Sequence, residues 1–177
     1  MSACPECGLD YDSMPASEAV AAIGGFGRRY RAPLTRLLAG EDESVLRARP
    51  APDTWSALEY AVHVRDVFRW YRGWVGQILV EDHPVLEGIG RDEAAVTGRY
   101  NEQDPAVVAT ELAEAAEALA SALAAVPDDG WDRAGTRRGE ERSVLTHARR
   151  AVHEGSHHLL DIGRGLRAVR AARAAAG

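Results

Sequence analysis

The fold is decided by residues 55–78, which read WSALEYAVHVRDVFRWYRGWVGQI. Ser56 and Glu59 form a capping-box pattern, in which the serine caps the backbone N–H of the glutamate and the glutamate side chain reaches back. Trp55 stands where it can pack on Tyr60 as a hydrophobic staple. Apolar residues then recur every three to four positions, which predicts a long amphipathic helix with a wide apolar stripe.

Three other segments have the same helical period. They are residues 15–38, which contain several glycines and a proline, a segment that begins at Asp104 and Pro105, and residues 143–172. No segment alternates with period two between turns, so no sheet is predicted. The expected fold is all-α, a four-helix bundle with a long crossover at residues 80–103, between helices 2 and 3.

Length and composition fit one globular domain. The chain has 177 residues, of which 46% are hydrophobic and 27% charged. We expect residues 1–14, which carry a Cys-x-x-Cys motif, to precede a bundle of residues 15–177. The net charge of −6 argues against nucleic acid as a partner, and no apolar run is long enough to insert in a membrane. Without a secretory signal pattern, the expected location is the cytoplasm.

Histidines carry the strongest chemical signal. His153 and His157 are four residues apart in a predicted helix, so their rings share one face, while His158 points about 100° away. His63 lies within the apolar stripe of residues 55–78 and needs a polar partner there. His63, His153 and His157 can hold one divalent metal ion with coordination positions left open, as catalysis requires. The alternative is that each is a core histidine bonded to a carbonyl.

Several charged side chains near these histidines have two interpretations. Asp161 can fix the tautomer of His157 or pair with Arg164 on the surface. Glu59, one turn from His63, is a candidate general base. Three arginines can bind a carboxylate of a ligand or remain surface charges: Arg65, Arg137 and Arg138.

The two cysteines allow three interpretations. Cys4 and Cys7 are reduced thiols in a tail, half of a structural zinc site, or a redox pair. A closed zinc site needs four ligands, which His83, His147 or a second subunit would have to complete. If the first helix spans the bundle, the pair lies at the far end from the histidine site.

Residues 55–67 (WSALEYAVHVRDV) resemble the second-helix motif of the DinB/YfiT-like superfamily, and residues 153–162 (HEGSHHLLDI) resemble the signature of its last helix. Residues 100–105 (YNEQDP) are similar to the start of the third helix in actinobacterial members. The basic residues are all arginine, with no lysine, which is the composition of a GC-rich genome.

This resemblance implies a metal-binding bundle that holds zinc, or alternatively nickel, through His63, His153 and His157. Relatives include thiol S-transferases and isomerases, such as mycothiol-dependent maleylpyruvate isomerase. The resemblance therefore implies transfer or isomerisation of a small electrophilic substrate by a low-molecular-weight thiol, here mycothiol. The alternatives are a metal-dependent hydrolase and a non-catalytic metal- or ligand-binding stress protein, and a homodimer through an exposed helix face is compatible with each.

Overall fold

The computed structural model describes residues 3–10, 12–88 and 90–176, so residues 1, 2 and 11 of the predicted N-terminal segment lie outside it. The α-helices are α1 (Ala16–Gly24), α2 (Phe26–Thr35), α3 (Ser44–Arg47), α4 (Ala57–Val80), α5 (Arg91–Thr97), α6 (Pro105–Ala124) and α7 (Val144–Ala176). Short 3-10 helices lie at Tyr100–Glu102 and Asp128–Gly130. The strands are β1 (Ala134–Arg137) and β2 (Glu140–Ser143).

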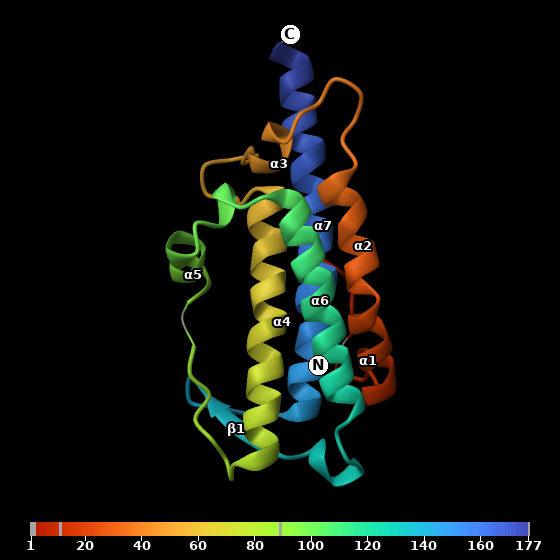
Figure 1. The fold of residues 1–177 in the computed structure, drawn as a ribbon, viewed down its shortest axis with the longest axis vertical. Coiled ribbons are helices and arrows are strands. Elements are labelled where there is room, and N and C mark those ends of the chain that lie inside the picture. The colour runs from red at the N-terminus through yellow and green to blue at the C-terminus, as the bar shows by residue number, and fades with distance from the viewer. Residues whose placement is uncertain (1–2, 11, 89, 177) are drawn as a thin grey trace.

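Four long helical segments form the bundle, with α1 and α2 together making one of them (Figure 1). α4 packs against α6 and α7, and the α1–α2 segment packs against the other side of the same two helices. The chain after α4 returns along the bundle through α5, so α4 and α6 run in the same direction (Figure 1). The predicted four-helix bundle is therefore confirmed, and its crossover lies between α4 and α6. Among the described residues, no helix is long and apolar enough to cross a bilayer.

The predicted helix starts are confirmed by their caps. The hydroxyl of Ser56 accepts a hydrogen bond from the Glu59 N–H at 3.1 Å, and the Glu59 carboxylate accepts one from the Ser56 N–H at 2.8 Å. The rings of Trp55 and Tyr60 meet at 5.6 Å between centroids. The Asp104 side chain caps α6 by accepting hydrogen bonds from two backbone N–H groups. These side chains satisfy N–H groups that the first turn of a helix leaves unpaired.

The first predicted helix is divided in two. α1 ends at Gly24 and α2 begins at Phe26, with Gly25 between them. Glycine weakens a helix because it gains more backbone freedom on unfolding than other residues. The two short helices nevertheless follow one path along α6, so the break leaves the bundle intact.

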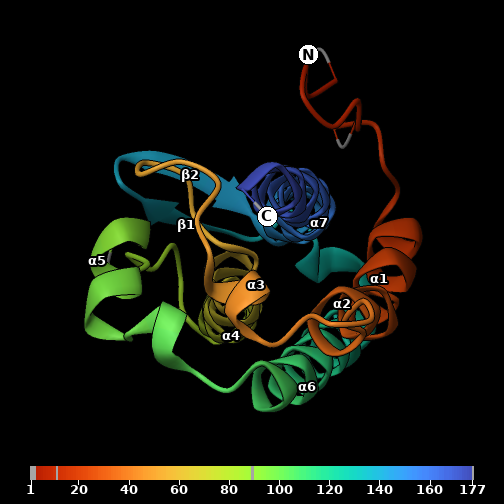
Figure 2. The same ribbon diagram turned by 90° about the horizontal axis from the view of Figure 1, so that it is seen from above.

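The expectation of no sheet was wrong, because β1 and β2 form an antiparallel hairpin. Its strands have only four residues each, too few to show a clear alternation. Arg138 and Gly139 make the turn with φ of +51° and +79°, the left-handed pair that a tight hairpin requires. Seen along the helices, the hairpin and the N-terminal segment flank α7 on different sides (Figure 2).

α2 and α6 pack closely at one point. A Cβ atom placed on Gly27 would lie 2.7 Å from the Cβ of Ala113 and 2.8 Å from its Cα. The second contact is with backbone, so no side-chain rotation relieves it. The absence of a side chain at Gly27 therefore sets the distance between these helices.

We expect Gly27→Ala to lower the free energy of unfolding by about 1–3 kcal/mol, the usual effect of overpacking a core. The matched control is Gly76→Ala in the exposed face of α4, where a new Cβ would meet nothing within 4 Å. That change should instead stabilise the protein by up to about 1 kcal/mol through helix propensity. Urea unfolding of both variants measures the two effects, and equal effects of one sign would contradict this account of the packing.

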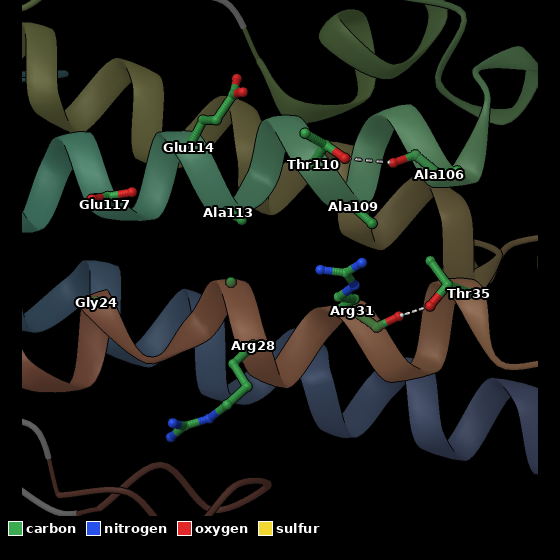
Figure 3. A pocket seen from close by; sticks show the side chains of 11 residues that line it. Gly24, Arg28, Arg31, Thr35, Ala106, Ala109, Thr110, Ala113, Glu114 and Glu117 are labelled. Carbon is green, nitrogen blue, oxygen red and sulfur yellow. Dashed lines mark hydrogen bonds between the residues drawn. The ribbon is translucent and has the colours of Figure 1, made fainter.

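A groove of about 690 Å³ lies between α2 and α6 beside this contact (Figure 3). Thr35 and Thr110 turn their hydroxyls onto carbonyls of their own helices, at 2.8 and 3.0 Å. Arg28 and Glu114 point away from each other (Figure 3). None of the described residues that line this groove is a histidine or a cysteine, so the groove contains none of the predicted metal ligands.

Candidate metal centre

A pocket of about 390 Å³ lies where α4, α7 and the hairpin meet. It contains all three predicted metal ligands, His63, His153 and His157, together with aromatic side chains of α4. Its arginines are Arg91, Arg137, Arg138, Arg142 and Arg150. Glu154 is the one carboxylate among the described residues that line it. The pocket is therefore strongly basic although the whole chain carries a charge of −6.

Arg137 shows how the basic wall is held. Its guanidinium lies 4.3 Å from the centroid of the Trp74 ring and donates to the carbonyl of Leu86 at 3.1 Å. Burial lowers the pKa of Arg137, and the positive charges of Arg138 and Arg142 lower it further. A bound anion would relieve that repulsion, so the wall suits a negatively charged ligand.

Two other predicted candidates have structural roles. Arg65 is buried and donates to Asp66 at 2.8 Å and to Glu111 at 2.6 Å, so it crosslinks α4 and α6 and does not line the pocket. The Glu59 carboxylate is bound by both Arg49 and the capping box. Burial alone would raise the pKa of Glu59, but these hydrogen bonds outweigh it and hold the pKa below its usual value. Glu59 is therefore poorly suited to act as a general base.

His63, Glu154 and His158 form a cluster, here called the His–Glu cluster, with one ligand atom of each within 4.8 Å of the others. The Glu154 Oε2 atom lies 3.4 Å from His63 Nε2 and 3.2 Å from His158 Nε2. Ligands about 2.0–2.1 Å from a tetrahedral metal ion are about 3.3 Å from one another. The donor atoms and their spacing thus fit a divalent ion, with room for further ligands from the pocket.

Asp161 orients His158 within this cluster. The Nδ1–H of His158 donates to Asp161 Oδ2 at 2.9 Å, which leaves Nε2 facing Glu154. Metal-binding histidines usually have such an outer carboxylate, which fixes the tautomer. Burial opposes the charge on His158, but Asp161 and Glu154 outweigh it and raise its pKa to about 9. A metal ion would therefore displace a proton from His158.

A second group, here called the Cys–His cluster, consists of Cys4, Cys7, His153 and His157. Its four ligand atoms lie within 4.8 Å of one another, and Cys4 Sγ is 3.6 Å from His157 Nδ1. Hydrogen bonds from the Cys7 backbone N–H and the His153 side chain lower the pKa of the Cys4 thiol to about 6. Burial raises the pKa of Cys7.

The expectation that the cysteine pair lies far from the histidine site was wrong. The N-terminal segment lies against α7, where Arg164 donates to the Glu6 carbonyl at 3.1 Å and Arg149 to the Met14 carbonyl at 2.8 Å. These contacts turn the segment back from the start of α1 toward the histidines. Neither His83 nor His147 belongs to a ligand cluster of the described residues.

The three predicted ligands share a pocket but do not form one ligand cluster. His153 and His157 group with the cysteines, and His63 groups with Glu154 and His158. A third group of His157, His158 and Asp161 links these two clusters. Two roles were predicted for Asp161, and its carboxylate lies near both partners, 3.6 Å from His157 and 3.8 Å from Arg164. It lies closer still to His158, at 2.9 Å. Sequence reasoning set His158 aside because it points away from His157, and it did not consider Glu154, although these two residues are also four apart.

His147 is a buried histidine with no hydrogen-bond partner for either ring nitrogen among the described residues. Its ring contacts those of Tyr71 and Trp74. Burial lowers the pKa of His147 to about 4, and Arg142 and Arg150 add to the effect. The ring is therefore neutral at pH 7 and packs against aromatic side chains.

We expect His147→Phe to stabilise the protein by about 1–3 kcal/mol at pH 7, because it removes buried unpaired polar atoms. The pKa of His147 is lower in the folded than in the unfolded state, so the unfolded chain takes up the proton first as pH falls. Relative to the variant, the wild type should therefore lose about 2 kcal/mol of stability between pH 7 and pH 5.

Urea unfolding at both pH values in the presence of a chelator measures this difference. The control is His83→Gln, which replaces an exposed histidine and keeps buried His147. A His147→Phe protein with the pH dependence of the wild type would contradict the assignment.

The fold is thus a four-helix bundle. Its second and last long helices bring together imidazole and carboxylate groups that are suited to binding a metal ion. Residues 28–162 match the family model of the DinB superfamily, and the chain belongs to that superfamily. Its fold is similar to that of YfiT from Bacillus subtilis, with a TM-score of 0.78 at 14% sequence identity over 88% of this chain and 90% of that chain. YfiT is described as a probable metal-dependent hydrolase with an unusual four-helix bundle topology. No curated protein matches the chain in sequence.

Proposed function

We propose that the chain is a metal-dependent enzyme that joins a low-molecular-weight thiol to a small anionic electrophile, as a transferase or isomerase. The observation that carries this proposal is the His–Glu cluster within a pocket lined by five arginines. A divalent ion held there supplies open coordination positions and favours the thiolate form of a bound thiol. Zinc is the ion we expect, because imidazole and carboxylate are among its usual ligands.

The protein side chains have separable roles in this proposal. His63, Glu154 and His158 hold the ion, and Asp161 keeps Nε2 of His158 directed at it. The basic wall binds the anionic group of the substrate and orients its electrophilic carbon. Trp74 holds Arg137 in place by stacking, which limits the freedom of that guanidinium before substrate binds.

Thiol chemistry suits the charge of the pocket. Positive charge lowers the pKa of a thiol, so a bound ion and the five arginines would favour the thiolate of a bound thiol, whose proton would pass to solvent. Mycothiol is the thiol that the likeness to actinobacterial members supports.

A metal-dependent hydrolase is the second candidate, and the description of YfiT favours it. In that case the same ligands would hold the ion and a bound water would be the nucleophile. The arginines would then bind an anionic leaving group or acyl group. The two functions differ in their need for added thiol.

The test is to assay zinc-loaded protein against small carboxylates with a conjugated double bond, with and without mycothiol. The proposal predicts turnover that needs both zinc and thiol, is lost in Glu154→Gln, and persists in the control His83→Ala. Hydrolysis of ester or amide substrates without thiol would overturn the transferase proposal in favour of the hydrolase. Turnover that survives both zinc removal and Glu154→Gln would overturn metal dependence.

A further inference from the structure

The Cys–His cluster is a second ligand set on α7, separate from the His–Glu cluster. We propose that Cys4, Cys7, His153 and His157 bind one zinc ion in a closed site that fastens the N-terminal segment to α7. Two thiolates and two imidazoles are a common ligand set of structural zinc sites. This inference does not rest on the proposed function, since it concerns different side chains.

The spacing of the donor atoms supports a tetrahedral ion. Zinc bonds of about 2.3 Å to sulfur and about 2.0–2.1 Å to nitrogen place a sulfur and a nitrogen ligand about 3.6 Å apart. Cys4 Sγ and His157 Nδ1 are 3.6 Å apart. All four donor atoms lie within 4.8 Å of one another, so small side-chain rotations bring them to bonding distance.

The backbone of the Cys-Pro-Glu-Cys-Gly segment places both sulfurs together. The N–H of Gly8 donates to the carbonyl of Cys4 at 2.8 Å, and the N–H of Cys4 donates to the carbonyl of Leu9 at 3.0 Å. Gly8 has φ of +71°, which a residue with a side chain rarely adopts. A closed turn of this kind holds its two cysteines ready for one ion.

α7 presents the two imidazoles from the other side. The rings of His153 and His157 are 5.1 Å apart between centroids, one helical turn apart along α7. His157 directs Nδ1 at the Cys4 sulfur, while its Nε2 lies 3.5 Å from Glu6 and 3.6 Å from Asp161. Carboxylates behind the second nitrogen are the outer partners that metal-binding histidines usually have.

A site with four protein ligands leaves no position for a substrate, so its role is structural. On binding, the two thiols release their protons to solvent and their negative charges balance the charge of Zn²⁺. His153 and His157 also line the pocket, so the ion would fix the positions of two of its side chains.

Cobalt(II) is a spectroscopic probe of this site, because only thiolate ligands give an intense sulfur-to-cobalt charge-transfer band in the near ultraviolet. Wild-type protein loaded with cobalt under reducing conditions should show that band. It should be weakened in Cys7→Ser, which keeps one thiolate, and lost when Cys4→Ser is combined with Cys7→Ser. His153→Ala should weaken cobalt binding at this site by more than about 100-fold, since even outer-shell losses cost 10–100-fold. His158→Ala and the control His83→Ala should keep the band.

Zinc should also protect both thiols from a thiol reagent and from disulfide formation in air. A cobalt-loaded wild type without the band, or a band unaffected by His153→Ala, would overturn the proposed ligand set. Rapid oxidation of Cys4 and Cys7 to a disulfide in the presence of zinc would identify them instead as a redox pair. The His158→Ala variant changes the His–Glu cluster and keeps all four side chains of the Cys–His cluster. If the proposed enzyme activity is not found, the cobalt band and the protection of the thiols still test the zinc site.

Discussion

Replacing His158 with alanine is expected to weaken metal binding at the His–Glu cluster by more than about 100-fold, since loss of an outer partner alone costs about 10–100-fold. The change removes one of the three proposed ligands, and among the described residues it leaves Glu154 with His63 as its one imidazole partner. Asp161→Asn should have a smaller effect in the same direction, because it removes the acceptor that orients His158. Competition titration against a chromogenic chelator measures both affinities.

His153→Ala is the matched control, since it also removes a histidine of α7 that lines the pocket. It should leave the affinity at the His–Glu cluster within a few-fold of the wild type. The two affinities can be separated because zinc at the Cys–His cluster protects the thiols. A result in which His153→Ala empties the centre and His158→Ala does not would support the ligand set first predicted from spacing.

Glu59→Gln is expected to lower the free energy of unfolding by about 1–3 kcal/mol, the usual cost of leaving a buried hydrogen-bonding group without its partner. The Arg49 side chain is 43% exposed, so its charge stays hydrated and adds little to this cost. Glu59 is 3% exposed, and its carboxylate accepts hydrogen bonds from Arg49 and from the Ser56 N–H. A carboxylate accepts these hydrogen bonds with two oxygens, whereas the amide of glutamine has only one acceptor oxygen. Metal affinity at the His–Glu cluster should not change, which distinguishes this structural role from catalysis.

The stabilisation from Glu59 should depend on pH in a defined direction. Its pKa is lower in the folded state than in the unfolded state, so the unfolded chain binds the proton more readily. The contribution is therefore complete above the unfolded pKa of about 4.3 and is lost as pH falls through the folded value. Urea unfolding at pH 7 and pH 4 should show the difference between wild type and Glu59→Gln narrowing at the lower pH.

Glu102→Gln gives a control for an exposed ion pair, since Glu102 pairs with Arg99 at the surface. It should change stability far less than Glu59→Gln does, because solvent and salt screen an exposed ion pair. Equal losses in Glu59→Gln and Glu102→Gln would contradict the role given to burial.

The helices could be predicted because their signals are local. The capping box at Ser56, the Asp104–Pro105 start and the apolar period each depend on neighbours in sequence, and the structure contains all three features. The hairpin could not be predicted in the same way. Its four-residue strands are held partly by a distant segment, where the Leu86 N–H donates to the carbonyl of Thr136.

The spacing of the ligands leaves two choices on α7, because the segment HEGSHH contains two overlapping pairs with a spacing of four. Spacing alone does not decide whether residues 153 and 157 or residues 154 and 158 face α4, since that depends on how α7 is rotated about its axis. The apolar arc carries this information. His158 falls between buried Gly155 and Ile162, whereas His153 and His157 are only half-buried.

The position of the cysteine pair depends on tertiary contacts. No pattern in the sequence of residues 3–14 predicts that the segment folds back along α7. That arrangement follows from long-range hydrogen bonds such as those made by Arg149 and Arg164. The basic wall also depends on tertiary contacts, because its arginines come from α5, the hairpin and α7.

The central claim is that the open metal centre consists of His63, Glu154 and His158. It is tested most directly by a crystal structure of zinc-loaded protein with anomalous difference density measured at the zinc absorption edge. We expect a peak in contact with those three side chains and facing the arginine wall, apart from any peak at the cysteines. A peak bound to His63 together with His153 and His157, with Glu154 and His158 not coordinated, would contradict the claim.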